Sequence, residues 1–334
     1  MSREQSAIIK GLAILLMLIY HLGNIKGISG LDNIFHATLS RSSFPISYFM
    51  IISGYGLYLS YGKGRLTWSY LFKRTLRLYI AYWLVLAIFV FGIGTIVYPG
   101  KFTFTVKSVL LNLTGWRWDY CNITWFLLPY ILVSLSSKWV FPLFDRLGNV
   151  ISLIVAAGLY VSSSFLISRY FDPWLNDHYA VYHVILWAQT LLTFTIGAVM
   201  AKLIVTGKKI TWDKLQGHNA LVILLIVAEF AIRGQFSTSA LNPLHATLVT
   251  WLMLHLEFSP VPLKLFVELG NKSMIMWLAQ GFIATVMFSE YFVLLRWPAL
   301  ILIAWVIICY LIACLLMPVV DAIARGAKLR SGSR

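Results

Sequence analysis

Ten stretches of about 20 mostly apolar residues recur along this chain, and they constrain its fold more than any other feature. A helix needs about 20 such residues to cross the hydrocarbon core of a bilayer. Because lipid offers the backbone no hydrogen-bond partners, a segment this apolar must cross as a helix. The sequence therefore predicts an all-α, polytopic membrane bundle of about ten transmembrane helices, at residues 7–25, 44–61, 79–98, 124–144, 149–168, 184–205, 219–236, 242–258, 272–292 and 297–319.

The composition agrees with this pattern. Hydrophobic residues make up 60% of the 334 and charged residues 12%, which excludes an ordinary soluble domain. We expect a single transmembrane domain over residues 1–324, followed by a short basic cytoplasmic tail over residues 325–334. The seventh and eighth windows are the least regular, because Glu229, Arg233 and His245 interrupt them.

The net charge of +15 is explained by where the basic residues fall. With ten alternating spans, 19 of the 27 lysines and arginines lie on the side that holds both termini, and 8 lie on the other. The positive-inside rule then predicts a multi-pass protein of the cell membrane with both termini in the cytoplasm. Since the chain offers no soluble basic surface, we expect it to contact the lipid bilayer and to bind no nucleic acid.

The first window carries polar side chains that lipid anchoring does not require. Lys10 and His21 are eleven residues apart, so they share one helix face at a separation of about 16 Å. An ionisable group inside a span costs about 2.5 kcal/mol or more unless it faces protein or water, which makes it a candidate functional residue. The alternative is a neutral His21 that hydrogen-bonds a neighbouring helix.

A basic run precedes the third window and contains Lys73, Arg74 and Arg77. The spacing of Arg74 and Arg77 places both guanidinium groups on one helix face. Guanidinium forks suit phosphate groups, and the alternative is a topology signal that contacts lipid headgroups.

Small and polar residues also interrupt two other windows. Ser53 and Gly54 lie midway along the second window, where small residues suit close helix packing. Gln280 lies within the ninth window and suits either a hydrogen bond between helices or a functional site.

We expect no bound metal. One predicted outer connection, residues 169–183, collects acidic and histidine side chains, but their spacing matches no known metal site: Asp172, Asp177, His178 and His183. The three cysteines likewise lack metal-ligand spacing.

Five stretches together resemble motifs of the acyltransferase 3 family of membrane acyltransferases, in the right order and across essentially the whole chain. They also resemble its fucose 4-O-acetylase-like branch. The motifs are Lys10 to His21, Phe49 to Tyr55, Lys73 to Trp83, Trp125 to Leu127 and Leu269 to Phe282. Two positions depart from the family, since many members carry arginine in place of Lys10 and histidine near Gln280.

The resemblance implies ten helices, cytoplasmic termini and an O-acyltransferase. Its donor would be a cytoplasmic acyl-CoA, expected to be acetyl-CoA, and its acceptor a hydroxyl of an extracytoplasmic cell-surface glycan. Such a transfer needs a base that titrates near neutral pH and donors for the developing oxyanion.

We expect His21 to be that base, because histidine titrates near neutral pH with little tuning. Lys10 would orient the donor or a helix carbonyl, and the basic run would bind the CoA phosphates. Ser53 suits the thioester end as an oxyanion donor or acyl carrier, with plain packing as the alternative. Two other functions stay open: an exporter of polysaccharide or lipid-linked sugar without transferase chemistry, and a membrane sensing module.

Overall fold

The computed structural model describes residues 1–23, 25 and 39–327, and every regular element among them is a helix. Residues 24 and 26–38, which follow the first helix, and residues 328–334 of the predicted tail lie outside the described residues. The main helices are α1 (Arg3–Leu22), α3 (Ile46–Gly62), α4 (Trp68–Leu86), α7 (Leu127–Tyr170), α8 (Tyr179–Val205), α9 (Asn219–Gly234), α10 (Asn242–Met253), α11 (Pro260–Gly281) and α13 (Pro298–Gly326).

Shorter helical segments extend or connect these helices. Three π-helices continue long helices: η1 (Ala87–Gly94) after α4, η3 (Phe171–Leu175) after α7 and η6 (Phe282–Met287) after α11. The others are α5 (Thr95–Val97), α6 (Val106–Leu113), η2 (Asn122–Phe126), η4 (Asp213–Leu215), η5 (Ser239–Leu241) and α12 (Ser289–Val293).

All ten predicted windows fall on helices. The fourth and fifth windows are the two halves of α7, which is interrupted at Gly148, where φ is 78° and the backbone leaves the helical region. Five helical segments of the described chain are long and apolar enough to cross a membrane: Arg3–Leu22, Trp68–Val97, Asn122–Tyr170, Tyr179–Val205 and Pro298–Gly326. The structure thus confirms an all-helical protein with several membrane-spanning candidates, and the count of ten spans stays a prediction.

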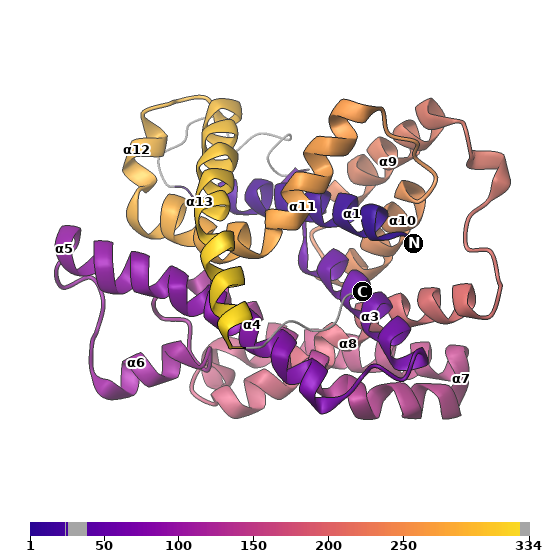
Figure 1. Cartoon of the computed structure of the whole chain (residues 1–334), viewed down its shortest axis with the longest axis horizontal. Helices are drawn as coiled ribbons and strands as arrows, with labels where there is room; N and C mark the ends of the chain where they lie inside the picture. The colour runs from indigo at the N-terminus through magenta and orange to yellow at the C-terminus, as the bar shows by residue number, and fades with distance from the viewer. Residues whose placement is uncertain (24, 26–38, 328–334) are drawn as a thin grey trace.

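Two pairs of helices approach closely through glycine. At Gly54, Gly197 and Gly270 an added Cβ atom would lie 1.9 Å from a backbone oxygen of the neighbouring helix. These glycines join α3 to α8 and α1 to α11, which lie side by side in Figure 1. Small residues allow such contacts inside a membrane, where dispersion forces rather than water drive helix association. Gly54 therefore serves packing, as one reading of its window predicted.

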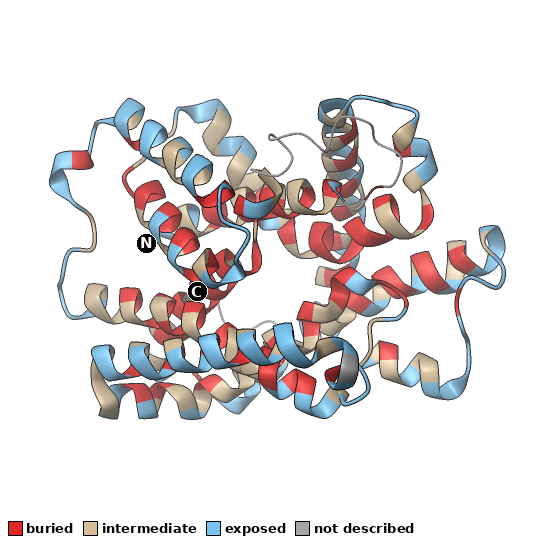
Figure 2. Ribbon diagram, turned by 180° about the vertical axis from the view of Figure 1, so that it is seen from behind, coloured by how far each residue is buried: buried red, intermediate tan, exposed pale blue. Residues whose placement is uncertain are grey.

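Buried residues lie between the helices and exposed residues lie on their outward faces (Figure 2). Many of the exposed side chains are apolar, among them Val150 of α7, Leu224 of α9 and Leu315 of α13, at 70%, 63% and 72% exposure. A soluble protein would hide such side chains, whereas the hydrocarbon of a bilayer covers them without cost.

Candidate functional site

A cavity of about 740 Å³ lies among α1, α3, α4, α7, α11 and α13, and we call it the basic cavity. Five of the six site residues predicted from the sequence line it: Lys10, Ser53, Lys73, Arg74 and Arg77. They come from three helices, so the fold brings together residues as far apart as the first helix and the third predicted window. Its size is that of an ordinary small-molecule site.

Arg74 is the centre of the hydrogen bonding in this cavity. Its Nη2 atom donates to Ser53 Oγ at 3.0 Å and also to the Tyr130 hydroxyl, and its Cζ atom lies 5.6 Å from the centroid of the Tyr130 ring. Ser53 lies on α3 and Tyr130 on α7, so the guanidinium joins three helices. Tyr130 was not among the site residues predicted from the sequence, although a phenol inside an apolar window can indicate a functional position.

The cavity carries an excess of positive charge. Across the part of the chain that the structure describes, no carboxylate lies within ion-pair distance of Lys10, Lys73 or Arg74. The partners of Arg74 that the structure shows are neutral hydroxyl groups. A concave site lined by charges of one sign concentrates ligands of the opposite sign. The basic cavity is therefore suited to an anion.

Arg77 differs from the other cations because it already has an acidic partner. Its Nη2 atom lies 2.6 Å from Asp321 Oδ1, and the two side chains are 45% and 42% exposed. An ion pair this exposed contributes only about 0–1 kcal/mol to stability. Asp321 also lines the cavity and would compete with a phosphate for Arg77. The two residues are 244 positions apart, so local sequence does not reveal this pairing.

Aromatic side chains form another part of the cavity wall. Phe126 and Trp277 both line it, with their rings in an edge-to-face arrangement and centroids 5.5 Å apart. Phe49 adds a third ring from α3. The wall therefore offers apolar surface to an uncharged part of a ligand whose charged part binds the cations.

His21 is not among the described residues that line the basic cavity. It lies in the last turn of α1, half-buried, with its ring 5.0 Å from the Tyr20 ring in an edge-to-face contact. Eleven residues of helix place it about 16 Å from Lys10. The fold thus brings Lys10 to Ser53 and the basic run, and keeps His21 apart from them.

A second polar group joins α3, α9 and α10, and we call it the histidine cluster: Tyr48, Glu229 and His245. His245 Nδ1 lies 3.0 Å from Glu229 Oε1, and His245 Nε2 lies 3.1 Å from the Tyr48 hydroxyl. Tyr48 and His245 are buried. Two of these residues were noticed in the sequence only as interruptions of apolar windows, whereas the pairing explains why those positions are polar.

Arg233, the other interruption, has a separate role. Its buried guanidinium donates to the backbone oxygens of Phe236 and Thr238 at 2.7 and 2.8 Å, and also to the side chain of Asn242. It therefore holds the connection between α9 and α10.

The histidines of the connection over residues 169–183 have protein partners. The His178 ring stacks on the Trp174 ring at 4.1 Å, and His183 Nε2 donates to the Trp116 backbone oxygen at 2.9 Å. Among the described residues, no group of three or more His, Cys, Asp or Glu side chains is placed to hold a metal ion.

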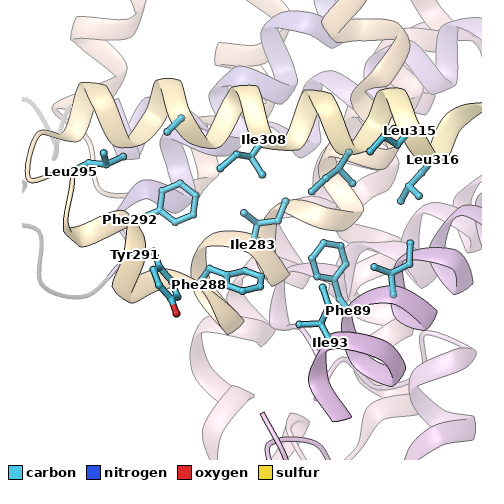
Figure 3. A pocket seen from close by; sticks show the side chains of 13 residues that line it. Phe89, Ile93, Ile283, Phe288, Tyr291, Phe292, Leu295, Ile308, Leu315 and Leu316 are labelled. Atoms are coloured by element: carbon cyan, nitrogen blue, oxygen red, sulfur yellow. The ribbon is translucent and has the colours of Figure 1, made fainter. Parts of the chain in front are cut away.

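A further cavity of about 560 Å³ lies among η1, η6, α12 and α13 (Figure 3). Its lining is aliphatic or aromatic, and the Tyr291 hydroxyl is the one polar group among those side chains, which are Ile88, Phe89, Ile93, Ile283, Phe288, Tyr291, Phe292, Leu295, Ala304, Ile308, Ile312, Leu315 and Leu316. Without a charged side chain in its lining, this cavity does not suit a phosphorylated ligand, which leaves the basic cavity as the candidate site.

Comparison with known proteins gives one finding. A family model described as an acyltransferase domain, of the acyltransferase 3 type, matches residues 6–320, which is nearly the whole chain. No curated protein and no solved structure matches the chain.

Proposed function

The chain belongs to the acyltransferase 3 family, and we propose that it transfers an acetyl group from cytoplasmic acetyl-CoA to a hydroxyl of an extracytoplasmic cell-surface glycan. The observation that carries this proposal is the basic cavity. Lys10, Lys73 and Arg74 line one concave site without an acidic partner among the described residues. A nucleotide thioester supplies both the phosphates that such a site attracts and an uncharged arm that its aromatic wall accommodates.

The cations of the basic run are assigned to the phosphates of the donor. Arg74 presents a planar fork, which binds phosphate more specifically than a point charge does. Lys73 adds charge from the same helix, and Arg77 joins them once its half-exposed pair with Asp321 opens. Ser53 accepts a hydrogen bond from Arg74, so we assign it to positioning that guanidinium rather than to carrying the acyl group.

His21 is assigned the role of general base. It takes the proton of the acceptor hydroxyl while the oxygen attacks the thioester carbonyl carbon. The bond from that carbon to sulfur then breaks, and the proton ends on the released thiol of CoA. Because Lys10 and His21 are about 16 Å apart, the pantetheine arm of the donor has to extend from the basic cavity toward the end of α1.

The test is whether the purified protein in lipid vesicles releases free CoA from labelled acetyl-CoA. We expect release that depends on an added glycan acceptor and label that appears as an ester on that glycan. Absence of both, with the protein folded, would contradict the proposal.

An exporter of polysaccharide or lipid-linked sugar is the alternative function. It predicts that a deletion strain loses surface glycan while the purified protein leaves acetyl-CoA intact. An acetyltransferase predicts instead that the deletion strain keeps its glycan and that mass spectrometry finds it lacking acetyl esters.

A further inference from the structure

The buried side-chain amide of Gln280 makes no hydrogen bond with any described residue. The residue is 0% exposed, and neither its Oε1 nor its Nε2 atom has a hydrogen-bond partner among the described residues. The reading of Gln280 as a hydrogen bond between helices therefore fails for the part of the chain that the structure describes. An unpaired buried polar group is destabilising, and native proteins keep few of them without a functional reason.

The position of Gln280 on α11 relates it to the basic cavity. Ser273 and Trp277 line the cavity, and Gln280 follows them by seven and three residues. Seven residues make two turns less about 20°, so Gln280 lies on the same helix face as Ser273. It lies about 4.5 Å further along the helix axis than Trp277, one turn beyond the aromatic wall.

The backbone that carries Gln280 is held on two sides. Trp305 of α13 donates its indole N–H to the Gln280 backbone oxygen at 3.2 Å. At the next residue, Gly281, an added Cβ atom would lie 2.5 Å from the Cys121 sulfur, so the helix packs tightly there. The α-helix changes to the π-helix η6 directly after this point, and such changes often occur at functional sites.

We propose that the Gln280 side-chain amide binds the thioester carbonyl oxygen of the acyl donor and stabilises the oxyanion that forms on it. This inference rests on the proposed function and deepens it, because it names the group that recognises the acyl end of the donor. The donor's phosphates bind at Arg74, its arm passes Trp277, and its carbonyl reaches the Nε2–H of Gln280.

The step balances without any further reactant. The acceptor oxygen forms a bond to the carbonyl carbon, and the electron pair of the C=O bond moves onto the oxygen that faces Gln280. When the pair returns, the carbon–sulfur bond breaks and the acceptor's proton goes to the sulfur. A donor aimed at the developing oxyanion lowers the barrier because it binds the transition state more tightly than the ground state.

The test compares two ligands that differ at the carbonyl. Acetyl-CoA contains it, and S-ethyl-CoA, a thioether, does not. We expect the wild-type protein in detergent to bind acetyl-CoA more tightly than S-ethyl-CoA by about 3- to 10-fold, the range of one hydrogen bond. In Gln280→Met, which keeps the length of the side chain and removes the donor, that preference disappears. Turnover of acetyl-CoA by this variant falls by about 100-fold or more.

Thr250→Val is the matched control. The Thr250 hydroxyl in α10 is also fully buried and without a partner among the described residues. Neither Gln280 nor Thr250 is a lining residue of the cavity, but Gln280 follows the lining residue Trp277 by about one turn, whereas α10 contributes no residue to the lining. Both substitutions replace an unpaired polar group with an apolar one, so both variants should melt at or above the wild-type temperature. Only Gln280→Met should lose activity, and Gln280→Leu provides a second test should the methionine variant fail to fold.

The outcomes separate the two proposals. If the wild type binds neither ligand, acetyl-CoA is not the donor and both proposals are wrong. If the wild type binds both ligands equally, or if Gln280→Met keeps the preference for acetyl-CoA and the wild-type rate, only the assignment of Gln280 is wrong.

Discussion

The guanidinium of Arg74 donates a hydrogen bond of 3.0 Å to the hydroxyl of Ser53, which joins α4 to α3 at the wall of the basic cavity. The same nitrogen donates to Tyr130 of α7. Both partners are neutral, so they orient the cation and leave its charge uncompensated. The charge of Arg74 therefore remains available to an anionic ligand. The charge of Arg77, in contrast, is paired with Asp321.

Arg74→Lys should weaken the binding of acetyl-CoA by about 10-fold or more, because hydrogen bonds to charged groups contribute about 1.5–3 kcal/mol. A lysine keeps the charge but cannot hold Ser53 and Tyr130 and also present a planar fork to phosphate. Isothermal titration of the purified protein measures the change. Arg65→Lys is the control, since Arg65 is an exposed basic residue between α3 and α4 that does not line the cavity. Equal losses in both variants would contradict the assignment of Arg74 to the phosphates.

His21→Ala should lower the turnover of acetyl-CoA by about 100- to 10,000-fold, the usual contribution of a general base. Its affinity for acetyl-CoA should stay the same, because His21 does not line the basic cavity. The measurement is the rate of CoA release beside a binding isotherm. The control is His178→Ala, which removes an exposed histidine stacked on Trp174. A folded His21→Ala protein with the parental rate would refute the assignment.

Gly270→Ala should destabilise the protein by about 1–3 kcal/mol, the usual cost of overpacking. The new methyl group would lie 1.9 Å from the backbone oxygen of Ala7 and force α1 and α11 apart. Thermal unfolding in detergent measures the effect. Gly158→Ala in α7 is the matched change, and it should be neutral or stabilising because nothing lies within 4 Å of the added atom.

His245→Ala should destabilise the protein more than Tyr48→Phe does. Removing the imidazole strands the Glu229 carboxylate and the buried Tyr48 hydroxyl together, and each unpaired group costs about 1–3 kcal/mol. Tyr48→Phe strands only one nitrogen of the ring. The two melting temperatures decide this order, and a reversed order would mean that the histidine cluster does not hold α3, α9 and α10 together.

Labelling of single cysteines tests the predicted topology. A cysteine at Asp177 should react with an impermeant maleimide in intact cells, because the connection over 169–183 is predicted to lie outside. A cysteine at Lys208 should react only after the membrane is opened. Both positions are exposed, whereas the native Cys121 and Cys309 are buried and should add little background. The opposite pattern would invert the predicted orientation.

Much of the fold could be predicted from local sequence. Each of the ten windows lies on a helix, because crossing hydrocarbon forces a segment to satisfy its own backbone hydrogen bonds, and that demand depends on no distant residue. The windows predicted the lengths of the individual helices less well. α10 has only 12 residues, fewer than the window over 242–258 implied, because the polypeptide turns after Met253.

The sequence also identified most of the residues of the basic cavity. Cations inside or beside apolar windows are costly, so Lys10 and the basic run were candidate functional residues before any fold was known. Local sequence is therefore sufficient to show which segments are helical and which side chains are costly to place in lipid.

Which of these side chains contact one another depends on the packing of the helices. The packing joins Arg74 to Tyr130 and Arg77 to Asp321, and it links Tyr48 to Glu229 through His245. It also leaves the Gln280 amide without a partner among the described residues and separates His21 from the basic cavity. Inside a bilayer, apolar helices gain no hydrophobic free energy by packing against one another, because lipid is as apolar as their side chains. Their pairing depends instead on close backbone contacts such as those at Gly54 and Gly270, which form only once distant helices have docked.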